Sequence, residues 1–155
     1  MTRMDSMSDV SFEDALAADA EALADLRVAA MRASLERVGR FDASRARARL
    51  LSSFDPAATR HIVAAGLRVG FCVVRTAPGA LLLDHLYVDP RHQGRGFGAA
   101  ALTGILRDAD RQGLDVRLGA LKESSANRFY LRHGFEPVGQ SDWDIHYVRK
   151  HRGPA

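Results

Sequence analysis

Three glycines, at positions 94, 96 and 98, lie close together where an apolar run gives way to a segment with helical character. The apolar run is LLLDHLYV, and the segment after the glycines is AAALTGILRDADRQ. Glycine tolerates positive φ angles and lets a ligand approach the main chain closely. A loop of this kind that leads into a helix presents unpaired N–H groups and the positive end of the helix dipole. The spacing therefore predicts a phosphate-binding loop over residues 93–98.

Two nucleotide-binding patterns compete for this loop. The first, the P-loop, ends in Gly-Lys-Ser/Thr, and that ending is absent here. The second, the dinucleotide-binding pattern, is met formally by Gly94-x-Gly96-x-x-Ala99, with Asp115 about 20 residues further on. Asp115 precedes its predicted strand, however, whereas a ribose-binding carboxylate closes one. Residues 99–155 are also too few for the rest of a doubly wound sheet. A glycine-rich turn that only connects two elements stays an alternative.

A second segment, KESSANRFYLRHGFEPVG over residues 122–139, has the pattern of a short helix that ends in a turn. Phe129 and Tyr130 lie three and four positions after Ala126, so the three residues share or border one helix face. Gly134 is a natural terminator in the left-handed conformation, and a strand is predicted to follow it.

The two segments together resemble motifs of the GCN5-related N-acetyltransferase family. The order of an apolar strand, V-x-P and then Gln93-x-x-Gly96-x-Gly98 resembles the family's acyl-CoA-binding motif. The spelling A-x-x-F-Y-x-x-x-G-F, about 30 residues later, resembles a second conserved segment of the same family. The family often has Asn seven residues before this Tyr, where the chain has Glu123. Asn127 is then the candidate for that polar contact.

The resemblance implies that loop amides hold the pyrophosphate of acetyl-CoA and that the preceding strand holds its pantetheine arm. Acetyl-CoA would be a co-substrate, and no metal is expected because no His/Cys cluster has ligand spacing. The implied acetyl-CoA-binding residues are Leu86, Tyr87, Val88, Gln93, Gly94, Arg95, Gly96, Phe97, Gly98, Ala99, Ala126, Asn127, Phe129 and Tyr130.

The implied reaction is acetyl transfer to a primary amine by direct attack through a tetrahedral intermediate. The amine must be neutral, although a lysine-like amine has a pKa of about 10.4, and the departing thiolate needs a proton. Tyr130 is the candidate acid, with packing under acetyl-CoA as its alternative role. Asp84 and His85, on opposite faces of one strand, are the candidate bases, and a structural role for both stays open. A backbone N–H around residues 86–88 is expected to polarise the carbonyl group.

The acceptor is predicted to be a small amine-bearing metabolite, because a helical lid over residues 19–54 favours an enclosed cleft. Carboxylates near the mouth would suit a cationic amine, and arginines would suit a carboxylate-bearing one. A protein lysine or N-terminus, a CoA-binding regulatory module and a nucleic-acid-binding module stay alternatives. The candidate acceptor residues are Arg32, Glu36, Arg40, Phe41 and Asp144.

The elements that must position these groups follow the order β-α-α-β-β-β-α-β-α-β-β, which is that of the family's acyl-CoA N-acyltransferase fold. This is an α/β fold with a mixed, twisted central sheet and helices on both faces. A strand is predicted over 10–15, and helices over 19–38 and from Asp42 to Asp55-Pro56. Three strands follow within 61–90, then a helix over 96–112, the strand VRLGAL, the second-motif helix, and strands near 135–140 and 143–150.

Length and composition fit this interpretation. With 155 residues, 46% of them hydrophobic, we expect one domain over 10–152 after a disordered leader over 1–9. A net charge of +3 without aromatic interleaving argues against nucleic acid as a partner. No apolar run approaches 18 residues and no signal peptide is visible. A single cysteine, Cys72, excludes an internal disulfide and suits a reducing cytoplasm, and its side chain is expected in the core. No membrane partner is expected, and a homodimer stays open.

Overall fold

The structure, a computed structural model, describes residues 9–153. The predicted leader therefore lies, except for Asp9, outside the described residues. The chain divides into two compact units. The first unit holds the residues up to Val73 and His85–Gly104, and the second holds Val74–Asp84 and the residues from Ile105 onward. A single domain over 10–152 stays a prediction.

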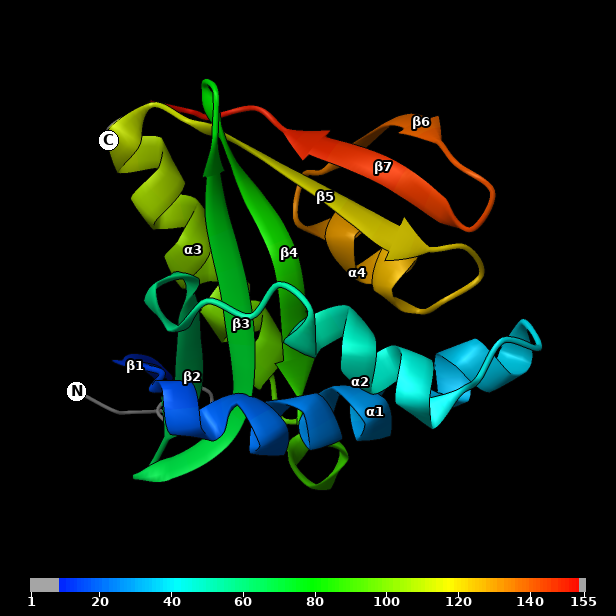
Figure 1. Cartoon of the computed structure of the whole chain (residues 1–155). Helices are drawn as coiled ribbons and strands as arrows, with labels where there is room; N and C mark the ends of the chain where they lie inside the picture. Colours follow the sequence, from blue (N-terminus) through cyan, green and yellow to red (C-terminus); the bar gives the residue numbers. More distant parts are fainter. Residues whose placement is uncertain (1–8, 154–155) are drawn as a thin grey trace. The chain divides into compact units, whose positions relative to one another are not determined.

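The described residues form seven strands and four α-helices in the predicted order (Figure 1). Short 3-10 helices, η2 (Ala17–Asp19), η3 (Pro56–Ala58) and η4 (Pro90–His92), lie between them. The main elements are β1 (Ser11–Asp14), α1 (Ala20–Arg37), α2 (Ala43–Leu51), β2 (Thr59–Ala64), β3 (Leu67–Ala77), β4 (Ala80–Val88), α3 (Phe97–Gln112), β5 (Asp115–Leu121), α4 (Ala126–Arg132), β6 (Glu136–Gln140) and β7 (Asp144–Arg149).

The strands form a seven-stranded mixed sheet in the order β1-β2-β3-β4-β5-β7-β6, as the predicted α/β fold requires. In the first unit β1, β2 and β3 are antiparallel neighbours. In the second unit β4 runs parallel to β5, with Ala80–Leu82 opposite Asp115–Arg117. The strands β5, β7 and β6 are antiparallel neighbours.

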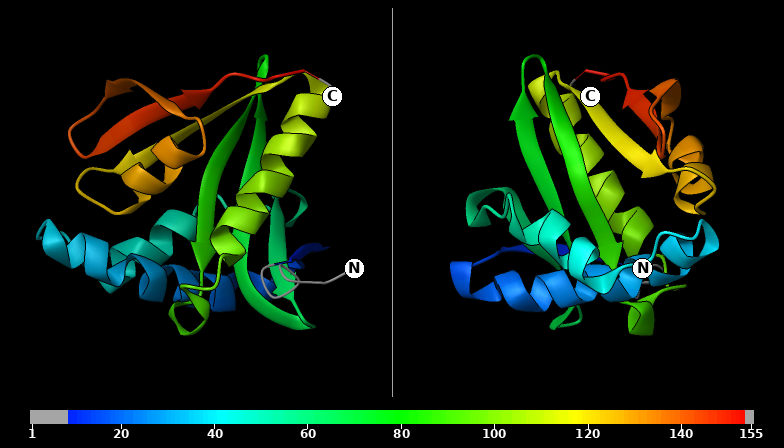
Figure 2. Two further views of the ribbon diagram at one scale, coloured as in Figure 1. Left: turned by 180° about the vertical axis from the view of Figure 1, so that it is seen from behind. Right: turned by 45° about the vertical axis from the view of Figure 1, so that its right-hand side comes forward.

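Helices cover both faces of the strands in the first unit (Figures 1 and 2). Leu23 of α1 and Leu50 of α2 belong to a buried cluster with Phe71 of β3. Ile62 of β2 belongs to another cluster, with Phe97 at the start of α3. Phe71 pairs with the residue before Ile62, and successive strand residues face opposite sides, so the two clusters lie on opposite faces.

Local signals explain why the helices begin and end where they do. The carboxylate of Asp42 accepts a hydrogen bond of 3.0 Å from the backbone N–H of Arg45, so it caps α2 as predicted. Gly113 and Gly134 have φ angles of +68° and +88°, and they follow α3 and α4 as the predicted terminators. Cys72 is buried in β3 as predicted, and burial raises the pKa of its thiol to about 11. A thiol with so high a pKa stays protonated at neutral pH, which disfavours a nucleophilic role.

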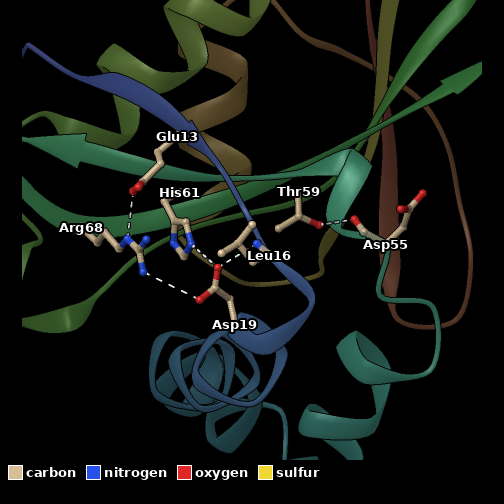
Figure 3. A network of polar contacts seen from close by, with 7 residues as sticks. All are labelled: Glu13, Leu16, Asp19, Asp55, Thr59, His61 and Arg68. Atoms are coloured by element: carbon tan, nitrogen blue, oxygen red, sulfur yellow. Dashed lines mark hydrogen bonds and ion pairs between the residues drawn. The ribbon is translucent and has the colours of Figure 1, made fainter.

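A polar network fixes the chain just before α1 to the edge of β2 (Figure 3). The Asp19 carboxylate accepts a hydrogen bond of 2.8 Å from the backbone N–H of Leu16 and lies 2.9 Å from Nε2 of the buried His61. These contacts, the backbone N–H first, hold the pKa of Asp19 below its usual range. Their contribution to stability is therefore present above the ordinary pKa of an aspartate and is lost as the pH falls through the lowered value.

A β-bulge and a glycine shape the first unit where β3 passes β4. Ile62 pairs with Gly70 and Val63 with Arg68, so Val69 is the extra residue of a bulge. A Cβ atom added to Gly70 would lie 2.2 Å from the carbonyl oxygen of Tyr87, a backbone atom that no rotamer change can move. Only glycine fits at this position.

We expect Gly70→Ala to lower the free energy of unfolding by about 2 kcal/mol, the usual scale of overpacking. Gly139→Ala is the matched control, because a Cβ atom there meets nothing within 4 Å. It should change stability by less than about 0.5 kcal/mol. Chemical denaturation measures both variants, and equal stabilities would contradict the close approach at Gly70.

Candidate active site

The glycine loop lies in the first unit, between β4 and α3. Residues 93–96 are exposed, whereas Phe97 is buried and anchors the first turn of α3. Gly94 and Gly96 have φ angles of +81° and +83°, which explains why glycine stands at these two positions. The Gln93 side chain donates a hydrogen bond of 2.9 Å to the carbonyl of Val88, which ties the loop to the end of the strand.

The start of α3 presents backbone donors beside this loop. The carbonyl of Gly96 accepts the first helical hydrogen bond, from the N–H of Ala100 at 3.0 Å. The N–H groups of residues 97–99 therefore have no acceptor within the helix. Three such donors at the positive end of a 16-residue helix suit an anionic group. Of the predicted loop residues, Arg95 is exposed, and Gly98 and Ala99 are half-buried.

The last residues of β4 alternate between the two faces of the first unit, as predicted. Leu86 and Val88 pack against the cluster that contains Phe97. The rings of His85 and Tyr87 lie on the other face, with centroids 6.4 and 5.5 Å from that of Phe71. The side chain of Tyr87 therefore lies on the face covered by α1 and α2, and its contact with acetyl-CoA stays a prediction.

His85 is the centre of a hydrogen-bonded chain on that face. Its Nε2 atom lies 3.2 Å from Nη1 of Arg49, and its Nδ1 atom lies 3.1 Å from the hydroxyl of Tyr87. Arg27 also donates to that hydroxyl, from Nε at 3.0 Å. A guanidinium only donates, so Nε2 must accept and the proton must be on Nδ1. The neutral tautomer with its proton on Nδ1 satisfies both of these contacts.

Asp84, the other candidate base, belongs to the second unit and forms an ion pair. Its Oδ2 atom accepts a hydrogen bond of 3.0 Å from Nε of Arg75, and the two side chains are only 14% and 25% exposed. A guanidinium in contact with a carboxylate favours the charged form. This contact therefore stabilises the carboxylate, and protonation of Asp84 would weaken it.

The second motif forms α4 in the second unit. Tyr130 is buried, and its ring packs edge-on against Phe135 with the centroids 5.4 Å apart. The ring centroids of Phe129 and His133 are 4.7 Å apart. Ala126, the first residue of the helix, is half-buried. The ring of Tyr130 thus has a packing role, and acid catalysis by its hydroxyl stays a prediction.

Asn127 fastens the start of α4 to the sheet. Its Nδ2 atom donates to the carbonyl of Leu121 at 2.9 Å, and its Oδ1 atom accepts a hydrogen bond of 2.7 Å from the hydroxyl of Tyr147. Both ends of the amide are therefore occupied, and its predicted contact with acetyl-CoA stays a prediction. Glu123 has a φ angle of +67°. Asn tolerates this left-handed conformation better than Glu, which agrees with the residue that the family often has there.

Three of the predicted acceptor residues lie together at the end of α1. Arg32 donates a hydrogen bond of 3.0 Å to Glu36, and its guanidinium carbon lies 4.5 Å from the ring centroid of Phe41. The side chains of this ion pair are 61% and 51% exposed, so it contributes little to stability. Arg40 is half-buried in the turn that follows. Asp144 begins β7 and belongs to the second unit.

Sequence reasoning missed the partners of the two candidate bases. Arg27 and Arg49 take part in the hydrogen-bond network of His85 and Tyr87, and Arg75 donates a hydrogen bond to Asp84. Arg27 stands four residues after Leu23, on the apolar side of its helix, and it is buried. A charged residue on the apolar stripe of an amphipathic helix was the one signal that could have found it.

Metal and membrane features are absent from the described part of the chain. Within residues 9–153, no group of three His, Cys, Asp or Glu side chains is placed to hold a metal ion. No helix of that range is long and apolar enough to cross a bilayer. A reaction without a metal stays a prediction.

Comparison with solved structures shows the fold. PaiA N-acetyltransferase from Thermoplasma acidophilum, solved in complex with coenzyme A, has a TM-score of 0.75 at 14% identity, over 92% of this chain and 99% of that one. A GCN5-related N-acetyltransferase from Rhodopseudomonas palustris has a TM-score of 0.70 at 21% identity, over 93% and 97% of the two chains. The ribosomal-protein-S18-alanine N-acetyltransferase from Escherichia coli has a TM-score of 0.68 at 16% identity, over 94% and 96%.

Comparison with curated protein sequences gives no match. The family model of the acetyltransferase (GNAT) domain, however, matches residues 57–137, just over half of the sequence. That range contains the glycine loop at the start of α3 and the second motif as far as the residues that follow Gly134. The chain belongs to the GNAT family of acetyltransferases.

Proposed function

We propose that this protein transfers the acetyl group of acetyl-CoA to the primary amine of a small metabolite. Family membership supports acetyl transfer in general. The observation that carries the use of acetyl-CoA is the exposed glycine loop, beside the three N–H groups of residues 97–99 at the start of α3. A structural neighbour, the Thermoplasma protein, is itself a coenzyme A complex.

Loop residues 93–98 would bind the pyrophosphate through their backbone, and the backbone of residues 86–88 would hold the pantetheine arm. A backbone N–H of the same strand segment would stabilise the oxyanion of the tetrahedral intermediate. His85 would take a proton from the ammonium group of the acceptor, and Tyr130 would return a proton to the thiolate of CoA.

Between the two candidate bases, the contacts favour His85. Proton transfer to Asp84 would weaken its ion pair with Arg75. The neutral form of His85 fits its contacts, and its Nε2 atom lies 3.2 Å from Arg49, an exposed residue of α2. Displacement of Arg49 by the acceptor would leave Nε2 open to an amine.

Nucleic-acid binding by the arginine-rich α2 has little support. Of its three arginines, Arg47 forms ion pairs with Glu21 and Asp25 of α1. Arg49 contacts His85. These two side chains therefore have partners within the first unit, and phosphates of a nucleic acid would have to compete for them.

Binding of acetyl-CoA by the loop is tested by Gly96→Val. Valine at a φ angle of +83° is strained, and its side chain would project from the loop that should hold the pyrophosphate. We expect the affinity for acetyl-CoA to fall at least about tenfold, or about 1.4 kcal/mol. Gly113→Val, at the other end of α3, is the matched control, since its φ angle of +68° brings similar strain and its surroundings are open. Calorimetry measures the affinity of each folded variant for acetyl-CoA. An unchanged affinity in Gly96→Val would contradict binding of acetyl-CoA by this loop.

The reaction itself is tested by thiol release from acetyl-CoA across a panel of amines, which should contain at least one acceptor. Labelled acetyl-CoA, supplied with a metabolite extract and a protein extract together, then separates the acceptor classes. Label mainly in small molecules supports the proposal, and label mainly in protein lysines or N-termini overturns it. Tight binding of acetyl-CoA without turnover of any amine would indicate a CoA-binding regulatory module instead.

A further inference from the structure

Arg27 is a buried guanidinium without an acidic partner. This residue of α1 is only 9% exposed. Nη1 donates a hydrogen bond of 2.9 Å to the backbone carbonyl of Ala46, and Nε donates to the hydroxyl of Tyr87. Both acceptors are neutral, and within residues 9–153 no carboxylate pairs with Arg27. Burying a charge without a counterion is costly, so this arginine calls for an explanation beyond packing.

The carboxylates on the neighbouring turns of α1 do not pair with Arg27. The contacts described for this face add a second guanidinium, that of Arg49, which lies 3.2 Å from His85. On α1 itself, the carboxylates of Glu21 and Asp25 are paired with Arg47. These two carboxylates therefore do not neutralise Arg27.

One amino group of Arg27 remains available to a ligand. Its two hydrogen bonds use Nε and Nη1, and Nη2 has no hydrogen-bond partner among the described residues. In that part of the chain, the fully enclosed side-chain atoms without a partner are His92 Nδ1 and Arg149 Nε. Nη2 of Arg27 is not one of them, so it is not fully enclosed and keeps some contact with solvent.

We propose that Arg27 binds a carboxylate of the acceptor and that the acceptor is an α-amino acid. This inference rests on the proposed acetyl transfer to a small amine. One carboxylate matches the charge of one buried guanidinium. Arg27 and His85 are bonded to the same hydroxyl oxygen, at 3.0 and 3.1 Å, so they are close neighbours. An α-amino acid has its carboxylate and its amine on one carbon, which fits an anion site next to a base.

The first experiment uses the whole wild-type chain and therefore needs no variant to fold. Thiol release from acetyl-CoA is measured with the standard L-amino acids, with the carboxamide of each, and with phosphoethanolamine and spermidine. We expect at least one amino acid to be acetylated with a kcat/KM at least about tenfold above that of its amide, because the amide lacks the charge that Arg27 binds.

The other outcomes separate this inference from the proposed function. The kcat/KM for spermidine, phosphoethanolamine or an amide could equal or exceed that for every amino acid. This result would overturn the carboxylate site but not the proposed acetyl transfer. No thiol release from any acceptor, with acetyl-CoA binding retained, would overturn both.

A variant then tests Arg27 itself. Arg27→Gln should raise the KM for the best amino acid at least about tenfold and leave the KM for acetyl-CoA unchanged. It should also bring the preference for the amino acid over its amide close to one, which loss of packing alone would not do. Arg37→Gln, an exposed arginine at the end of the same helix, is the matched control and should keep the preference. Should Arg27→Gln fail to fold, Arg27→Lys replaces it, with a smaller loss expected. Full retention of the preference in a folded Arg27 variant would overturn the assignment.

Discussion

Replacement of Tyr130 by phenylalanine should lower the kcat of acetyl transfer by about 100-fold, the lower end of what a positioned acid contributes. The affinity for acetyl-CoA should not change. The physical reason is that the substitution removes the hydroxyl alone. The ring, buried and packed edge-on against Phe135, keeps its contacts, so α4 should remain in place.

Tyr147→Phe is the control for this experiment. Tyr147 is another buried tyrosine of the second unit, and its hydroxyl donates a hydrogen bond of 2.7 Å to Asn127. Loss of that bond should cost about 1 kcal/mol of stability, with kcat changed far less than in Tyr130→Phe. Both variants are assayed with the best acceptor and saturating acetyl-CoA. Unchanged turnover in Tyr130→Phe would make Tyr130 a packing residue.

Much of the fold could be predicted because its signals are local. Asp42 caps α2 through a residue three positions away, and Gly113 and Gly134 end their helices through their own φ angles. Such features depend on a few neighbouring residues, so a single sequence reveals them. The alternation that separates His85 from Leu86 is equally local, because it follows from strand geometry.

The rest depends on contacts between distant parts of the chain. The bulge at Val69 is set by how β2 pairs with β3, and Gly70 is required only because β4 passes close to it. Nothing within a few residues of Gly70 reveals that approach. The sequence alone indicates only that Gly70 weakens its strand, because glycine has no side chain to pack.

The same reasoning applies to the candidate site. His85 could be named from its residue type and strand position, but its protonation depends on Arg49, 36 positions away. Tyr87 could be named from its place in the strand before the loop, but the contact of its hydroxyl with Arg27, 60 positions away, could not. Residue type and spacing therefore identify candidate groups, and only the packing of α1 and α2 shows which of them act on one another.

Replacement of His85 tests most directly whether this residue is the general base. His85→Gln should lower kcat/KM at neutral pH at least about 100-fold, the usual contribution of a general base. Glutamine cannot take up the proton. Its amide can still accept from Arg49 and donate toward Tyr87, as the neutral imidazole does, so α1, α2 and β4 should stay together.

The pH profile supplies the decisive measurement. In the wild type, kcat/KM should rise with pH through one ionisation, because only the neutral imidazole accepts a proton. This ionisation should vanish in His85→Gln and persist in Asp84→Asn, the matched variant at the neighbouring position. Its loss in Asp84→Asn alone would assign the base to Asp84, in spite of the ion pair with Arg75. Its persistence in both variants would mean that neither residue takes the proton and that the amine loses it to solvent or to another group.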